Sequence, residues 1–92
     1  MDAKKTVEMS NLLSEVAAER QRQTEKWGEQ NHSTYKYLAI LGEEVGEANK
    51  AVLDHEDKPE GNPLENLRME LIQVAAVAVA MIECGDRNNW WK

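Results

Sequence analysis

Five oxygen-bearing side chains form the pattern in this sequence that is best suited to chemistry. They are Glu43, Glu44, Glu47, Glu70 and Gln73. At about 100° per residue, the first three lie within roughly one third of a helix circumference. If two helices face each other, the two halves of the pattern come together. Hard oxygen ligands without paired histidine or cysteine suit Mg²⁺ or Mn²⁺ and do not suit zinc.

Such a set of ligands can bind a triphosphate through shared metal oxygens. It can also make a water nucleophilic enough to attack phosphorus. The alternative for the acidic cluster alone is a solvated face, because like charges three or four residues apart on a helix repel. Glu44 and Glu47 border the apolar stripe of their helix, whereas Glu43 lies further out. That placement favours a cation over simple solvation.

Apolar residues at helical spacing predict an all-α fold in one domain over residues 1–92. The expected helices cover residues 7–27, about 35–53 and 63–84. The first carries a long polar face that includes Glu15 and Glu19. We expect an antiparallel bundle of these three main helices with a short C-terminal tail, completed by oligomerisation.

Local signals set the ends of these helices. Residues 1–6 read as a frayed start, and glycine after Trp27 ends the first helix. Residues 54–61 are expected to be a polar loop. Asn62 as N-cap before a proline predicts the start of the third helix, and Gly85 predicts its end.

The third helix is apolar on every face over residues 74–82. A helix of this kind is buried on every face. Two other helices cannot surround it, so we expect a second copy of the chain to do so. A 92-residue domain also has a marginal core of its own. Trp90 and Trp91 are expected to cap a hydrophobic edge or a partner surface.

Two glycines flank the acidic cluster, Gly42 and Gly46. Each costs about 1 kcal/mol relative to alanine in a helix interior. Their presence suggests that something packs close to this backbone, and a neighbouring helix and a ligand are equal alternatives.

Composition narrows the function classes. A net charge of -6 argues against non-specific nucleic-acid binding or attachment to an anionic membrane, both of which need a basic face. The single cysteine, Cys84, excludes an internal disulfide and a cysteine-based zinc site, and it fits a reducing, cytoplasmic compartment. No signal peptide is evident at the N-terminus, and residues 74–82 are too few to span a bilayer.

In both halves of the acidic pattern, the chain resembles the MazG-like, all-α nucleoside triphosphate pyrophosphohydrolases, which are relatives of the dimeric dUTPases. The signature of that family is Glu-Glu-x-x-Glu followed, after a variable gap, by Glu-x-x-Asp. Residues 43–47 match the first half, and residues 70–73 match the second half except that Gln73 replaces the aspartate. The resemblance covers about residues 17–86, and residues 20–32 look like compact phage and bacterial members.

The resemblance implies Mg²⁺-dependent hydrolysis of a (deoxy)nucleoside triphosphate to the monophosphate and pyrophosphate, by a dimer or tetramer. Carried over to this chain, the metal ligands are Glu44, Glu47, Glu70 and Gln73. Glu43 is a further ligand or orients the attacking water, so Glu43 and Glu44 are the expected catalytic residues. The amide of Gln73 can coordinate a hard cation but brings no charge, so weaker metal binding, an altered metal preference and an inactive site are all consistent with it.

Five residues are candidates for substrate binding, of which the resemblance points to the first two. They are Trp27, His32, Lys36, Lys50 and Arg68. Trp27 would stack on the base and His32 would bond the base or sugar, whereas the three basic residues would contact phosphates. The alternatives are a tryptophan that closes the core, a histidine that caps a loop and solvated ion pairs.

Two rival functions remain. A di-iron carboxylate bundle needs Glu-x-x-His on two helices, and this chain has it once, at Glu29 to His32, in an expected loop. The stronger rival is a catalytically silent helical oligomer that binds nucleotide or another protein, and Gln73 is its best support.

Overall fold

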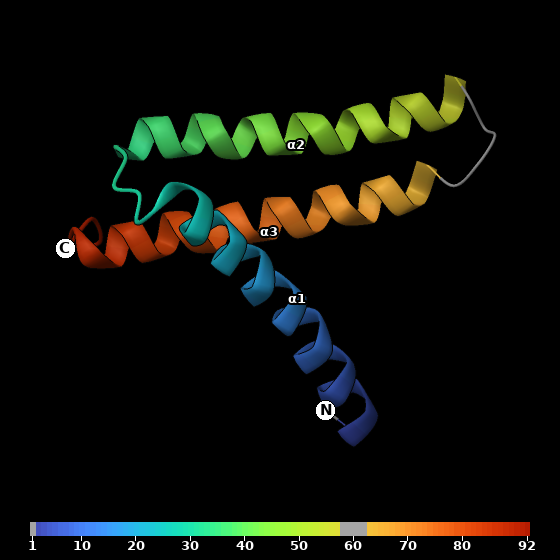
Figure 1. Cartoon of the computed structure of the whole chain (residues 1–92), viewed down its shortest axis with the longest axis horizontal. Coiled ribbons are helices and arrows are strands. Elements are labelled where there is room, and N and C mark those ends of the chain that lie inside the picture. The colour runs from blue at the N-terminus through green and yellow to red at the C-terminus, as the bar shows by residue number, and fades with distance from the viewer. Residues whose placement is uncertain (1, 58–62) are drawn as a thin grey trace.

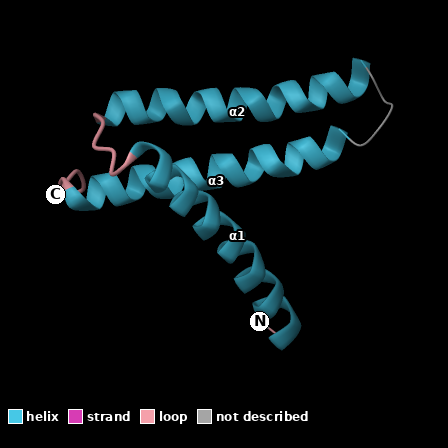
Figure 2. Cartoon of the chain, in the orientation of Figure 1, coloured by secondary structure: helices cyan, strands magenta, loops and turns pink. Residues whose placement is uncertain are grey.

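The structure is a computed structural model that describes residues 2–57 and 63–92. These residues form three helices: α1 (Ala3–Trp27), α2 (Thr34–Asp57) and α3 (Pro63–Arg87). The parts of the chain that it describes contain no strand (Figure 2), so the predicted all-α class is confirmed. No helix among them combines the length and the apolar character needed to cross a membrane.

Helix α3 is the central element, because it packs against both other helices. Figure 1 shows α2 and α3 side by side along their lengths, running in opposite directions. Helix α1 crosses α3 near the C-terminal half of α3 and then diverges, so the N-terminus lies far from the helix pair. The single chain is therefore a helix pair braced at one end, not a closed three-helix bundle.

Helix α1 is capped at both ends by local residues. The Asp2 side chain accepts a hydrogen bond from the backbone N–H of Lys5 at 2.9 Å, which satisfies one of the free amides of the first turn. The expected frayed start is thus wrong, because this cap begins the helix at Ala3. At the other end Gly28 adopts φ 73 and donates its N–H to Thr24, as expected from the sequence.

Helix α2 begins after Ser33, whose hydroxyl accepts a hydrogen bond from the backbone N–H of Lys36 at 3.1 Å. It continues to Asp57, so the expected loop at residues 54–57 is wrong. Those residues are polar but include neither proline nor glycine, and nothing in them stops a helix. The rest of the expected loop and the expected cap Asn62 lie outside the described residues, while the predicted start of α3 at Pro63 is confirmed.

Gly85 does not end α3, which continues to Arg87. The chain then turns back through Asn89 at φ 58, and the N–H of Trp90 donates to the carbonyl of Gly85 at 2.9 Å. A Cβ atom at position 85 would overlap the Trp91 ring and crowd Trp90. The glycine is needed because two tryptophans pack on the helix there. Its predicted role as the end of the helix is wrong.

The core lies at this same end of the molecule. Tyr37, Ala80 and Cys84 are buried together, and Met81 and Trp90 pack against them. Trp90 meets Tyr37 edge-on with 6.4 Å between ring centroids, so its predicted role at a hydrophobic edge is confirmed.

The connector at residues 28–33 is tied to the end of α3 by polar contacts. The side-chain oxygen Oδ1 of Asn31 accepts hydrogen bonds from Asn88 at 3.0 Å and from Arg87 at 3.3 Å. Arg87 also forms an ion pair with Glu29 at 2.8 Å. These bonds pair polar groups of Glu29 and Asn31 and hold the connector against the end of α3.

The apolar stretch of α3 is only partly covered. Ala76 and Val77 are buried, but Val79 and Ile82 are 39% and 54% exposed. Within the single chain α1 diverges and leaves one side of α3 open, as expected for two helices that cannot surround a third; that a second copy covers this side stays a prediction.

Candidate functional site

Helices α2 and α3 bring two of the expected ligands to one groove. Glu47 and Glu70 both line a groove of about 160 Å³, together with Lys50, Asp54 and Asn66. The two helices run antiparallel side by side (Figure 1), so residues that lie far apart in the sequence line the same groove. The two halves of the acidic pattern therefore meet, as their spacing predicts.

Glu44 lies next to this groove and is partly buried. Burial raises the pKa of the Glu44 carboxyl group, and the nearby charges of Glu70, Glu47, Glu43 and Glu19 raise it further, in that order. Each of these neighbours disfavours a second negative charge at the same place. The acids of α2 and α3 thus form one electrostatic cluster. Within it, the ionised form of Glu44 is disfavoured by burial and by its acidic neighbours. Glu43 is exposed at its margin.

The cluster is not arranged as a finished cation cage. Within residues 2–57 and 63–92, no three His, Cys, Asp or Glu side chains are gathered as a metal-binding group. The donor set itself is suitable, because carboxylate oxygens are the ligands that Mg²⁺ and Mn²⁺ prefer. A cation would also relieve the repulsion that raises the pKa of Glu44.

A second cavity, of about 210 Å³, adjoins the same acids. Its walls combine apolar side chains, one aromatic indole, three amides, a phenol and a single charged group. These residues are Gln23, Trp27, Gln30, Tyr37, Ile40, Glu44, Gln73, Val77 and Ala80. Glu44 lines this cavity, and its charge interacts with those of Glu70 and Glu47 in the groove, so the cavity and the acidic cluster are neighbours.

Gln73 is turned toward α1. Its side-chain carbonyl oxygen accepts a hydrogen bond from the Gln23 amide at 3.4 Å. The residue lines the 210 Å³ cavity but not the groove of Glu47 and Glu70. Its carbonyl oxygen is thus already engaged by an α1 side chain.

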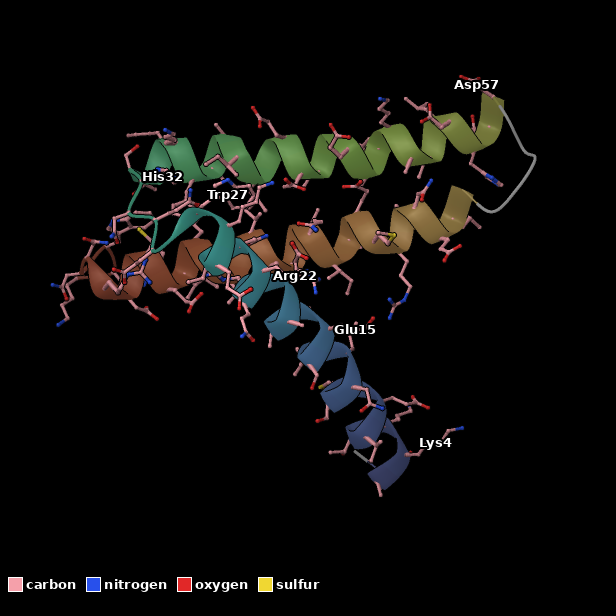
Figure 3. All side chains as sticks on the ribbon, viewed as in Figure 1. Lys4, Glu15, Arg22, Trp27, His32 and Asp57 are labelled. Carbon is pink, nitrogen blue, oxygen red and sulfur yellow. The ribbon has the colours of Figure 1, made fainter. Side chains whose placement is uncertain are left out.

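The two predicted aromatic residues lie at the same end of the molecule (Figure 3). Trp27 lines the 210 Å³ cavity and is 55% exposed. His32 instead packs edge-on against Tyr37, with 5.0 Å between ring centroids, and its backbone carbonyl faces the Cys84 thiol at 3.6 Å. His32 is not among the residues that line either cavity.

The three predicted basic residues occupy different surroundings. Lys50 lines the groove of Glu47 and Glu70. Lys36 is exposed in the first turn of α2. Arg68 forms a two-pronged ion pair with Glu15 of α1, at 3.0 and 2.6 Å. Only Lys50 therefore lies beside the acidic cluster.

One member of the cluster was missed by the sequence reasoning. Glu19 was placed on the polar face of α1, but it is only 8% exposed. It pairs with Arg22 at 2.5 Å, and its charge contributes to the raised pKa of Glu44. The available signal was its spacing of three residues from Val16, the other buried residue of α1.

Comparison with family models, with curated proteins and with solved structures gives no match.

Proposed function

We propose that this chain is a metal-dependent nucleoside triphosphate pyrophosphohydrolase of the MazG-like type that its sequence resembles. The observation that carries the proposal is the meeting of Glu47 and Glu70 in one groove, with Glu44 at its border. Mutually repelling carboxylates next to a small cavity are an arrangement that bound cations and a charged substrate would stabilise.

The two hollows suit different parts of a nucleotide. The 210 Å³ cavity, with Trp27 at its mouth, fits an uncharged ring. The groove beside it contains Lys50 and fits phosphate oxygens, provided that a cation offsets the carboxylates. Arg68 would have to leave Glu15 before it could bind a phosphate.

Mg²⁺ or Mn²⁺ would be held by Glu44, Glu47 and Glu70. When bound, the cation would supply charge neutralisation for the triphosphate and acidify a water molecule. The protein contributes the oxygen donors and the Lys50 ammonium, and Glu43 at the exposed margin orients the attacking water. The products are the nucleoside monophosphate and pyrophosphate, a reaction that removes unwanted nucleotides from the pool.

We also propose that the working form is a homodimer or homotetramer. The single chain leaves many large apolar side chains exposed on all three helices. They include Leu13, Leu53, Leu64, Met69 and Ile82. Burying them against a second copy would supply the core that a 92-residue chain lacks. The free, buried Cys84 fits a reducing, cytoplasmic setting.

The direct test is pyrophosphate release from a panel of ribo- and deoxyribonucleoside triphosphates with Mg²⁺ or Mn²⁺. We expect release from at least one substrate, and Glu44→Gln and Glu47→Gln should each abolish it. Glu8→Gln, which removes an exposed carboxylate on the diverging part of α1, is the matched control and should retain full activity. If no substrate releases pyrophosphate at high protein concentration, the proposed enzymatic activity is refuted.

A second candidate is a catalytically silent helical oligomer that binds nucleotide or a protein partner. It is favoured by the amide at Gln73 and by the lack of a ready-made metal-binding group in the described part of the chain. Nucleotide binding without any pyrophosphate release, with either cation, would select this candidate.

A further inference from the structure

A chain of hydrogen bonds links α3 to α1 and returns to α3 at Gln73. Glu83 accepts a hydrogen bond from Arg20 Nε at 2.8 Å. A second Arg20 nitrogen donates to the side-chain oxygen of Gln23 at 3.1 Å. Gln23 Nε2 then donates to the side-chain oxygen of Gln73 at 3.4 Å.

The direction of this chain is determined by its first members. A guanidinium can only donate hydrogen bonds, so Gln23 must turn its oxygen toward Arg20. Its amide nitrogen then faces Gln73, and Gln73 must turn its own oxygen toward Gln23. The orientation of both amides, which is otherwise ambiguous for glutamine, follows from this network. The free end of the chain is the NH₂ group of Gln73.

The cavity at this free end disfavours an anion. Glu44 is the one charged group among the residues that line it, and that charge is negative. The remaining walls are apolar or neutral, with Ile40, Val77 and Ala80 on the helix pair. At about 210 Å³ the cavity is smaller than the roughly 300 Å³ at which sites for whole drug-sized ligands begin. It therefore fits a single uncharged ring system.

We propose that Gln73 is the residue that reads this ring: its NH₂ group donates a hydrogen bond to a carbonyl oxygen or ring nitrogen of a heterocyclic base, and Arg20 and Gln23 hold it in that orientation. The inference builds on the proposed nucleotide hydrolysis. It assigns Gln73 to substrate recognition and removes it from the metal ligands, so that Glu44, Glu47 and Glu70 bind the cation without it.

The test uses the four deoxynucleosides as probes, because they carry the base and sugar without phosphates. The side-chain NH₂ resonance of Gln73 is assigned in an ¹⁵N-labelled protein by its loss in Gln73→Glu. We expect this resonance to shift on titration with the tightest-binding deoxynucleoside. The isosteric Gln73→Glu removes the donor but still accepts from Gln23, and it should weaken binding about threefold to tenfold, as for loss of one hydrogen bond.

Gln23→Glu tests the orientation itself. A carboxylate at position 23 accepts from Arg20 and also from the Gln73 NH₂ group, so Gln73 must turn its oxygen to the cavity. The Gln73 NH₂ resonance should then remain in the spectrum but should no longer respond to the deoxynucleoside. Gln21→Leu, on the exposed surface of α1, is the control and should leave both the resonance and the binding unchanged.

Three results would overturn the inference. They are a Gln73 resonance that does not move while the Trp27 indole N–H does, unchanged binding in Gln73→Glu, and absence of binding by all four deoxynucleosides. A Gln73→Leu protein whose Mg²⁺ requirement for pyrophosphate release rises severalfold would restore Gln73 as a metal ligand. Hydrolysis without deoxynucleoside binding refutes this inference alone, and deoxynucleoside binding without hydrolysis refutes only the proposed enzyme.

Discussion

The two ends of the α2–α3 pair are built very differently. At one end α1 crosses α3, the side chains of Tyr37 and Cys84 are buried, and Asn31 ties the connector to α3. Toward the other end α1 diverges from the pair, and of the described residues there Leu53 and Leu64 are 60% and 52% exposed. The difference shows that one bracing helix can order a core over only part of a 25-residue helix such as α3.

The candidate site lies between these two ends. The 210 Å³ cavity extends toward the ordered core through Tyr37 and Ala80, whereas the groove of Glu47 and Glu70 extends toward the open end. The 210 Å³ cavity is therefore held by packing and by the Arg20 hydrogen bonds. The groove of Glu47 and Glu70 is lined by residues of α2 and α3 alone.

The largest expected effect on stability is at the end that contains the buried core of Tyr37, Ala80 and Cys84. Tyr37→Ala removes a buried ring from the core and should lower the free energy of unfolding by about 3 kcal/mol, measured by urea denaturation. Tyr35→Ala is the matched control, because Tyr35 is 86% exposed, and its effect should stay within about 0.5 kcal/mol. Equal losses for the two tyrosines would contradict the division into ordered and open ends.

Alanine substitutions at two glycines should have opposite signs. A Cβ at Gly46 meets nothing within 4 Å, so Gly46→Ala should raise stability by up to about 1 kcal/mol through helix propensity. Among the described residues, no other helix therefore packs against the Cβ position of this glycine.

Gly85→Ala must displace the tryptophan rings that pack on α3. The cost of such crowding is about 1–3 kcal/mol, which outweighs the propensity gain, so the variant should be less stable. Thermal unfolding of both alanine variants beside the wild type measures the contrast. Stabilisation by Gly85→Ala would mean that the C-terminal turn does not press on the helix.

Glu44→Gln should stabilise the metal-free protein by a few degrees in its unfolding temperature. The raised pKa of Glu44 means that the folded state binds this proton more tightly than the unfolded state does. Its contribution to stability is therefore present below the unfolded pKa and is lost as the pH rises through the folded pKa. The gain of the variant should accordingly be larger at pH 8 than at pH 4, measured in the presence of a chelator.

The control for that prediction is Glu8→Gln. Glu8 is an exposed carboxylate on α1 that pairs with Lys4. Its unfolding temperature should not depend on pH in the same way. Destabilisation by Glu44→Gln at pH 8 would show that the charge of Glu44 is satisfied without a cation, and it would weaken the proposed metal site.

The smallest expected effect is at the exposed contact between α1 and α3. The hydrogen bonds from Arg68 lower the pKa of Glu15, so their contribution is present above the unfolded pKa and is lost as the pH falls through the folded pKa. Arg68→Met should therefore lower the unfolding temperature slightly at pH 7 and not at pH 2. A loss as large as that of Tyr37→Ala would mean that this ion pair, and not the core, holds α1 in place.

Two signals that act within one or two turns predict helix ends that the structure confirms, whereas the local predictions of a frayed start and of a stop at Gly85 are wrong. The stop at Gly28 and the start at Pro63 depend on backbone preferences of the residues themselves, and both are confirmed. Helix α2 extends beyond its predicted end near residue 53, because a polar run without proline or glycine does not break a helix. The pairing of Glu47 with Glu70 also followed from sequence, since helical spacing puts each acid on the face that borders the core.

The features that were missed depend on contacts between distant segments. Glu19 is buried only because of where α1 crosses the helix pair, and Gly85 is needed only because Trp91 folds back onto it. The direction of the Gln73 amide likewise depends on Arg20 of another helix.

The sequence by itself thus determined the three helices and the two acidic half-patterns, because caps and periodicity act through neighbouring residues. The tertiary structure alone decided which carboxylates share a groove with Lys50, which acid is partly buried near them and which atom of Gln73 faces Gln23. Burial and hydrogen-bond direction are properties of several helices together, and no single stretch of the chain contains them.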